Sequence, residues 1–204
     1  ILRAQTVRRL FVLLAAVSLG AVLATGTPVV LVLVAGRPLG SAWLHEQCAA
    51  VLMAWLPGQE GGTAVAEVLA GDAGPGGKLP ISYPHTTGQI PVYYGHKISG
   101  GRSHWEGDYV DAPAAPLYPF GHGIAYTTFA LSGAVLARTE LSWHEPVTTT
   151  VTVTNTGRRA GDEVVQLYVR DPVASVTRPV LELASFARLS LTPVRGSALL
   201  AGQI

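Results

Sequence analysis

The pattern of apolar positions divides the chain into a mixed α/β part and an all-β part. Residues 29–34 form a continuous apolar run, which is typical of a strand buried on both faces of a parallel sheet. Apolar residues recur at helical spacing over residues 41–56 and again over 64–69, so each stretch predicts a helix. Residues 79–82 predict a short returning strand. The order strand, helix, helix, strand indicates a parallel α/β layer.

Beyond residue 129 the pattern predicts strands only. Residues 147–154 alternate apolar and polar side chains, as do residues 164–170, where Val165, Leu167 and Val169 are expected to point inward. Residues 181–191 form a third, less regular run. An antiparallel sandwich of this kind takes about 100 residues and seven strands. The stretch from residue 129 onward is shorter, so we expect an incomplete sandwich without its last strands.

The first 20 residues allow two interpretations. An apolar run of fifteen residues, Leu10–Ala24, follows Arg8 and Arg9. This run is shorter than the ~20 residues that span a bilayer. It fits the apolar region of a signal peptide, and it equally fits a buried helix that leads into the first strand. Secreted, periplasmic and cytoplasmic locations therefore all stay open.

Composition excludes several classes of partner. The net charge is +1 and only 13% of residues are charged, so nothing indicates a nucleic-acid partner. Hydrophobic residues make up 49% of the chain, which suffices for buried cores. Cys48 is the sole cysteine, so no intrachain disulfide can form. Its place on the apolar stripe of the predicted helix indicates a small core residue.

A junction of aromatic, proline and glycine residues joins the two parts. Residues 117–129 read Leu-Tyr-Pro-Phe-Gly-His-Gly-Ile-Ala-Tyr-Thr-Thr-Phe, in which proline and glycine break regular structure while the aromatic rings favour burial. This stretch resembles the end of the α/β-sandwich domain of family-3 glycoside hydrolases. Further motifs of that family follow in the expected order, at residues 28–39, 54–62, 71–72, 77–80, 89–91 and 163–171.

The resemblance covers roughly residues 21–200 and implies a fold. Residues 1–20 are an apolar N-terminal segment, helical or signal-like. Residues 21–126 would be the C-terminal part of the α/β-sandwich domain, a partial parallel α/β sandwich with a long loop at 83–116. Residues 127–204 would be an all-β, fibronectin type III-like (immunoglobulin-like) sandwich, truncated.

The resemblance also implies a function, that of a retaining, exo-acting β-glycosidase of the β-glucosidase or β-xylosidase type. In the family the nucleophilic aspartate lies on an N-terminal barrel that this chain lacks, and the acid/base glutamate lies upstream of the segment that matches Pro28. No acidic residue here matches either motif, so we expect no catalytic residue and no activity in this chain alone. Glu60 is the best-matched acid, and we expect a structural role for it. No cofactor is expected, and the carbohydrate substrate would bind through the full-length enzyme.

The loop at 83–116 is the best candidate for substrate contact. Long loops in compact domains are usually functional or disordered, and its aromatic residues argue against disorder. Sugar rings stack on aromatic side chains, and their hydroxyls need polar partners. The candidate substrate-binding residues are Arg102, His104, Trp105, Glu106 and Asp108. Alternatively, the loop is an ordered surface segment packed on its own aromatics.

The sequence also bears on metal binding and on an alternative to an enzyme. The spacing of His104, Glu106 and Asp108 matches no zinc or calcium pattern, so no metal site is expected. A non-catalytic carbohydrate-binding or scaffolding module is the alternative to an enzyme portion. The sugar, the linkage and the oligomeric state do not follow from the sequence.

Overall fold

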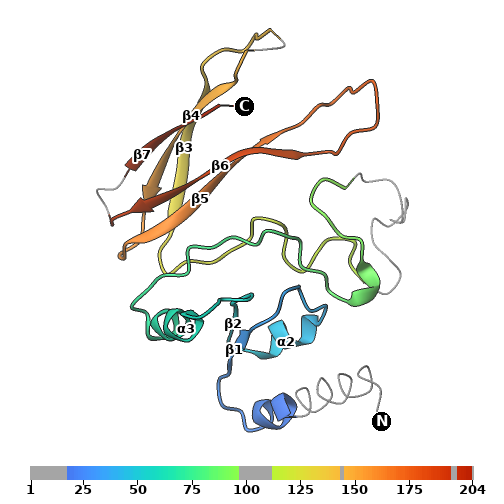
Figure 1. The fold of residues 1–204 in the computed structure, drawn as a ribbon, viewed down its shortest axis with the longest axis vertical. Helices are drawn as coiled ribbons and strands as arrows, with labels where there is room; N and C mark the ends of the chain where they lie inside the picture. Colours follow the sequence, from blue (N-terminus) through green and yellow to red (C-terminus); the bar gives the residue numbers. More distant parts are fainter. Residues whose placement is uncertain (1–17, 97–111, 143–144, 194–196, 204) are drawn as a thin grey trace.

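The computed structural model describes residues 18–96, 112–142, 145–193 and 197–203. A small α/β part lies at one end of the molecule and a β part at the other (Figure 1). Between them run long irregular segments, among them residues 112–128, that carry the chain from the first part to the second (Figure 1).

The α/β part is built around two parallel strands. Strand β1 (Val30–Leu33) pairs with β2 (Ala50–Met53) in parallel, and the helix α2 (Ala42–Gln47) connects them. Helix α3 (Gly61–Ala70) follows and ends at Gly71, whose φ of 82° is the left-handed conformation that glycine accepts without strain. The parallel layer and the second predicted helix are therefore confirmed.

The prediction of one helix over residues 41–56 is wrong. The helix ends at Gln47, because Cys48 is extended with φ −90° and ψ 142°, and residues 50–53 form β2. A short apolar run fits a strand as well as a helix, so periodicity alone does not decide between them. Pairing with β1 decides it, since β1 would otherwise leave that edge of its backbone unbonded.

Two predictions about strands are also corrected. Residues 79–82 form no strand; the bonds from Leu79 N to His122 O and from Gly121 N to Leu79 O, both 2.8 Å, hold them beside the junction. Proline interrupts both segments and removes the donors that a regular ladder needs. The 29–34 run is not buried on both faces, since Val34 is 62% exposed. Within the described residues its sheet has only two strands, too few to cover it.

The N-terminal segment enters the described part as a helix over residues 18–23 with mostly exposed side chains. The expected burial of such a helix is therefore not found in this stretch. Residues 1–17 lie outside the described residues, so the two interpretations of the apolar run stay predictions. Searching the described residues reveals no helix of the length and hydropathy that a membrane span requires.

The β part contains two antiparallel sheets, as predicted. One has the order β3-β4-β7 and the other pairs β5 with β6. The core between them is formed by Val153, Val165 and Leu191, with Phe129, Val151 and Leu189 packed against it. The part of this region that the structure describes contains no helix. The strands are β3 (Phe129–Leu136), β4 (Thr148–Asn155), β5 (Gly161–Val169), β6 (Glu182–Leu191) and β7 (Ser197–Gln203).

The inward direction predicted for Val169 is wrong. Val165 is buried as expected, but Val169 is exposed at the end of β5. The register between β5 and β6 shifts between Leu167 and Tyr168. Such an irregularity moves the following side chains out of the simple alternation.

Asn155 fastens the end of β4 to its surroundings. Its side chain is fully buried, and its Oδ1 accepts hydrogen bonds from Thr127 Oγ1 at 2.7 Å and from Gly157 N at 3.0 Å. Its Nδ2 donates to Arg159 O at 2.8 Å and to Leu191 O at 3.0 Å. One amide therefore satisfies buried groups from the junction, the β4–β5 connection and β6.

An ion pair joins the two parts of the molecule. Lys78 Nζ lies 3.0 Å from Glu163 Oε1 on β5, and the two side chains are only 16% and 15% exposed. Lys78 Nζ also donates to the carbonyl of Gly123 at 3.2 Å. The ammonium group of Lys78 therefore contacts both the sandwich and the junction.

We expect Asn155→Ala to lower the free energy of unfolding by about 2–3 kcal/mol, because it strands buried donors and acceptors. Urea unfolding of this chain, followed by circular dichroism, would measure the change. Thr156→Ala is the matched control, since the Thr156 hydroxyl bonds at an exposed position. Equal midpoints for the two variants would contradict the role given to Asn155.

For the ion pair, we expect Lys78→Met to cost about 2–3 kcal/mol, because Glu163 then keeps a poorly solvated charge without its partner. The double variant Lys78→Met/Glu163→Leu should recover most of that loss. Removing the exposed pair of Arg138 and Glu145 by Arg138→Met should change little. A double variant as unstable as Lys78→Met would refute the explanation by an unpaired charge.

Candidate functional site

All five sequence-predicted substrate residues fall in one segment. Arg102, His104, Trp105, Glu106 and Asp108 belong to residues 97–111, outside the described residues. Their role therefore stays a prediction. The structure does describe both ends of the loop, residues 83–96 and 112–116, and shows what holds them.

Gln89 links the two ends of the loop. It ends the short helix η1 (Thr87–Gln89), and its side chain is buried. Its Oε1 accepts a hydrogen bond from His85 N at 2.7 Å, while its Nε2 donates to the carbonyls of Pro113 at 2.9 Å and Ala115 at 2.7 Å. One side-chain amide thus links the segment that enters the loop to the segment that leaves it.

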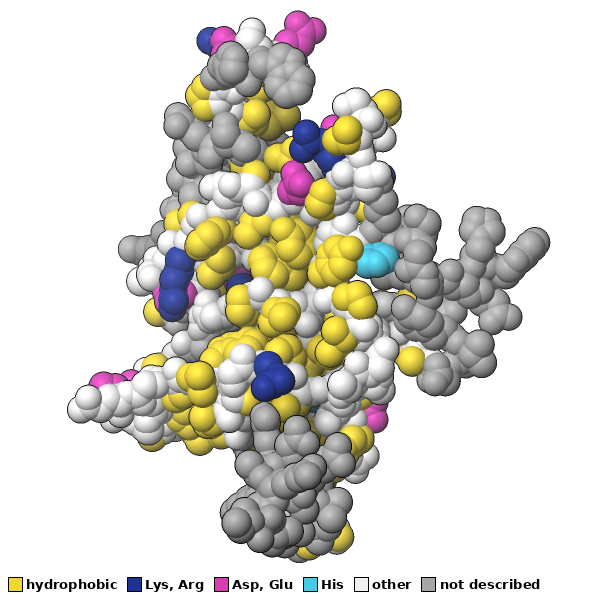
Figure 2. Space-filling model, turned by 45° about the vertical axis from the view of Figure 1, so that its right-hand side comes forward, with side chains coloured by type: hydrophobic (Ala, Val, Ile, Leu, Met, Phe, Trp, Pro, Cys, Tyr) yellow, Lys and Arg dark blue, Asp and Glu magenta, His cyan; other side chains and the backbone are white. Residues whose placement is uncertain are grey.

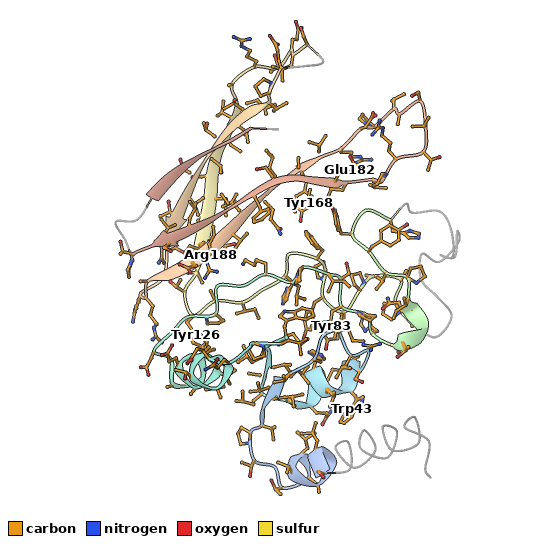
Figure 3. The ribbon with its side chains drawn as sticks, in the orientation of Figure 1. Trp43, Tyr83, Tyr126, Tyr168, Glu182 and Arg188 are labelled. Carbon is orange, nitrogen blue, oxygen red and sulfur yellow. The ribbon has the colours of Figure 1, made fainter. Side chains whose placement is uncertain are left out.

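Tyr94 holds the outgoing end of the loop against the sandwich. Its ring stacks on Phe120 of the junction with centroids 4.5 Å apart, and meets the ring of Tyr168 edge-on at 5.8 Å. Its hydroxyl accepts a hydrogen bond from the backbone N of Leu183 at 3.1 Å. Burial raises the pKa of the Tyr168 phenol, with a smaller contribution from Tyr94. Figure 3 shows Tyr168 on the side of the sandwich that faces the irregular segments.

Backbone bonding continues this contact at the next residue. The carbonyl of Gly95 accepts a hydrogen bond from Val180 N at 3.0 Å. A Cβ at position 95 would lie 3.0 Å from the carbonyl oxygen of Leu181, so a larger residue would push the two segments apart. The outgoing end of the loop is therefore fixed to the segment that precedes β6.

A second cluster combines two histidines and two tyrosines. Tyr83 is buried, and its ring lies 5.0 Å from that of His45 and 6.1 Å from that of Tyr118. Tyr118 in turn stacks on His122 at 4.7 Å. The Tyr83 hydroxyl accepts a hydrogen bond from Leu39 N at 3.1 Å. The rings pack α2, residue 83 and the junction together.

The histidines of this cluster are held neutral. Both ring nitrogens of His45 are buried without a hydrogen-bond partner among the described residues, and burial lowers its pKa. Burial also lowers the pKa of His122, with a further contribution from the charge of Lys78. These environments resist protonation, so the rings act as packing groups rather than as proton donors.

The acidic residues of β5 do not form a catalytic pair. Asp162 accepts hydrogen bonds from Ser190 Oγ at 2.6 Å and from Arg188 Nε at 3.0 Å, and these contacts lower the pKa of its carboxyl. Glu163 is its neighbour on the strand and is paired with Lys78. A general acid needs a raised pKa, whereas the contacts of Asp162 lower the pKa of its carboxyl. Glu163 is engaged by the ammonium of Lys78 instead of facing an open site.

Other candidates in the described part are equally poor. Glu60 precedes the first turn of α3, is exposed and makes no capping hydrogen bond. No group of three or more potential metal ligands occurs among the described residues. A hollow of about 560 Å³ is lined only by residues 170–180, so it has no opposing wall from another segment.

Sequence reasoning missed the roles of Gln89 and Gly95. The motif around Gln89 carries only a family resemblance, and no periodic signal connects residue 89 to residues 113–115. Gly95 gave no signal either, because the segment it approaches is more than eighty residues away in the chain. Contacts between irregular segments leave no periodic pattern.

Comparison with known proteins identifies both parts. The model of the Glycosyl hydrolase family 3 C-terminal domain matches residues 16–126. The model of the Fibronectin type III-like domain matches residues 163–196. The first match alone covers more than half of the chain.

Individual relatives agree with these matches. A periplasmic beta-glucosidase of Salmonella typhimurium is 46% identical over 177 residues, which are 83% of this chain and 23% of the relative. A beta-xylosidase of Formosa agariphila is 44% identical over 172 residues, with the same shares. The crystal structure of a beta-glucosidase from Listeria innocua in complex with glucose superposes with a TM-score of 0.82 at 39% identity, covering 90% of this chain and 26% of that one.

The chain spans about a quarter of the length of these relatives. Its α/β part and its sandwich occur in the same order as the two family matches. The chain belongs to glycoside hydrolase family 3 and carries its C-terminal domain followed by a fibronectin type III-like domain.

Proposed function

We propose that this chain is a portion of a retaining, exo-acting β-glycosidase that hydrolyses terminal β-linked sugars. The observation that carries the proposal is the similarity across both domains to proteins named beta-glucosidase and beta-xylosidase. The chemistry requires a nucleophile and an acid/base whose carboxyl groups lie ~5–5.5 Å apart. The environments of Asp162 and Glu163 suit neither role, so we assign both catalytic groups to sequence outside this chain.

Exposed apolar surface supports an association with further protein. Apolar side chains cover much of one face of the molecule, over both the α/β part and the β part (Figure 2). Ile124 in the junction is 77% exposed, and Leu56 is similarly open. Extended apolar surface usually marks a contact with another protein surface. In the proposed enzyme this contact would be made by the N-terminal barrel, through which the carbohydrate substrate also binds.

Within that enzyme we assign substrate contact to the loop at 83–116. Its two ends are fixed by Gln89 and Tyr94, so the loop starts and returns at set positions. An aromatic ring among polar side chains suits a sugar, whose ring has apolar faces and whose hydroxyls need partners. The residues proposed are Arg102, His104, Trp105, Glu106 and Asp108.

The alternative is a non-catalytic carbohydrate-binding or scaffolding module. One observation favours it, namely that the acids of β5 are committed to Arg188 and Lys78 rather than to an open cleft. The two functions differ in whether the full-length protein turns over a glycoside.

We expect the full-length protein to hydrolyse an aryl β-glucoside or β-xyloside with retention of the anomeric configuration, and this chain alone to release no aglycone. The chain alone lacks a matched pair of catalytic carboxyl groups, which supply most of the barrier reduction. Aglycone release from these substrates and from an α-arabinofuranoside measures hydrolysis. NMR identification of the sugar anomer that forms first measures retention.

The control for the chain alone is the variant Glu106→Gln/Asp108→Asn. Turnover by the chain that this variant abolishes would move the active site into the loop and contradict the assignment. A full-length protein inactive on all these substrates would favour the non-catalytic module.

A further prediction concerns Trp105. In the full-length protein, Trp105→Ala should raise KM about fivefold, as expected for the loss of one stacking contact. Trp43→Ala is the matched control, because Trp43 is an exposed tryptophan on α2 (Figure 3). Unchanged kinetics on several aglycones would make the loop a merely structural element.

A further inference from the structure

Tyr93 is an exposed aromatic ring in a segment whose backbone is held by the sandwich and the junction. Its side chain is 54% exposed, whereas the ring of its neighbour Tyr94 stacks on Phe120. The ring centroid lies 4.9 Å from that of His96, with the planes inclined by 56°. The backbone N of His96 donates to the Tyr93 carbonyl at 3.2 Å, so residues 93–96 form a tight turn. The turn places the two rings together at the surface.

The backbone that carries this ring is fixed at both following residues. The Tyr94 side chain is held by Phe120 and by the backbone of Leu183, and the Gly95 carbonyl is bonded to Val180. The ring of Tyr93 is therefore presented from an ordered segment rather than from a free loop. A preordered aromatic ring loses little conformational entropy when a ligand binds.

We propose that Tyr93, supported by His96, is a binding surface on which a sugar ring of the glycoside stacks. This inference rests on the proposed function, which supplies the ligand class. The apolar C–H face of a pyranose can stack on an exposed aromatic ring. A tyrosine ring offers a large apolar contact area and carries a polar hydroxyl at its edge.

The inference assigns Tyr93 to binding rather than to chemistry. The stacking contact is made with a sugar ring and not with the reacting atoms, so it should act on KM and leave kcat within about twofold. The phenol hydroxyl is not required for stacking, so Tyr93→Phe should behave like the parent protein.

The test uses the full-length protein. We expect Tyr93→Ala to raise KM for a β-linked disaccharide or trisaccharide about fivefold, and to reduce the retardation of the protein in native gels that contain soluble β-glucan. Tyr126→Ala is the control, because Tyr126 is an exposed tyrosine of the junction whose hydroxyl bonds to Val68 O at 2.8 Å, away from residues 93–96. Its KM and retardation should match those of the parent.

The outcomes separate this inference from the proposed function. An active enzyme in which Tyr93→Ala leaves KM and retardation unchanged overturns the stacking surface, while the proposed function stands. A lowered melting temperature with unchanged KM also overturns it, because Tyr93 then packs against the rest of the protein. If the full-length protein is inactive, the proposed enzyme fails, and the gel retardation still decides whether Tyr93 binds a glucan.

Discussion

Buried polar groups in irregular backbone must find partners, and this requirement governs how the protein is assembled. The segments between the α/β part and the sandwich have no ladder of regular hydrogen bonds to rely on. Three side chains supply much of what is missing. Gln89 bonds to both ends of the long loop, Asn155 to the end of β4 and its surroundings, and Lys78 to Gly123 and Glu163. Each is nearly or fully enclosed, so each bond is made away from competing water.

These contacts make the fibronectin type III-like domain a structural partner of the loop. Leu183 of β6 bonds to the Tyr94 hydroxyl, and Val180, just before β6, bonds to Gly95. Strand β5 supplies Glu163 and Tyr168 to the same interface. The junction also approaches β5 closely at Gly121, which lies against the side-chain amide of Gln166. The sandwich therefore orders the residues from which the proposed sugar-binding loop departs. This gives a physical reason for the two domains to occur together.

The charged and titratable side chains of the described part stabilise the fold and form no catalytic group. Lys78 and Glu163 pair at the domain interface and Arg188 pairs with Asp162 at the surface, while partial burial lowers the pKa of His45 and of His122. Such groups stabilise the fold without offering a proton donor at neutral pH. The proposed substrate contacts accordingly lie on loops, which the rest of the fold holds in position.

The sequence by itself determined the family, the order of the two domains and those elements whose pattern is local. The alternation of Val151 and Val153 in β4 and the stop of α3 at Gly71 follow from side-chain period and glycine conformation. The five candidate residues of the loop rest on the length of the loop and on its mixture of aromatic and polar side chains. Tertiary structure decided the rest. Residues 50–53 form a strand because β1 lies beside them. Residues 79–82 form no strand, because they bond to the junction, where proline interrupts the regular pattern. It also decided that Lys78 meets Glu163 and that Gln89 meets residues 113–115. The physical reason is that periodicity records which face of an element is apolar, whereas the partner of a buried polar group is chosen by contacts distant in the chain.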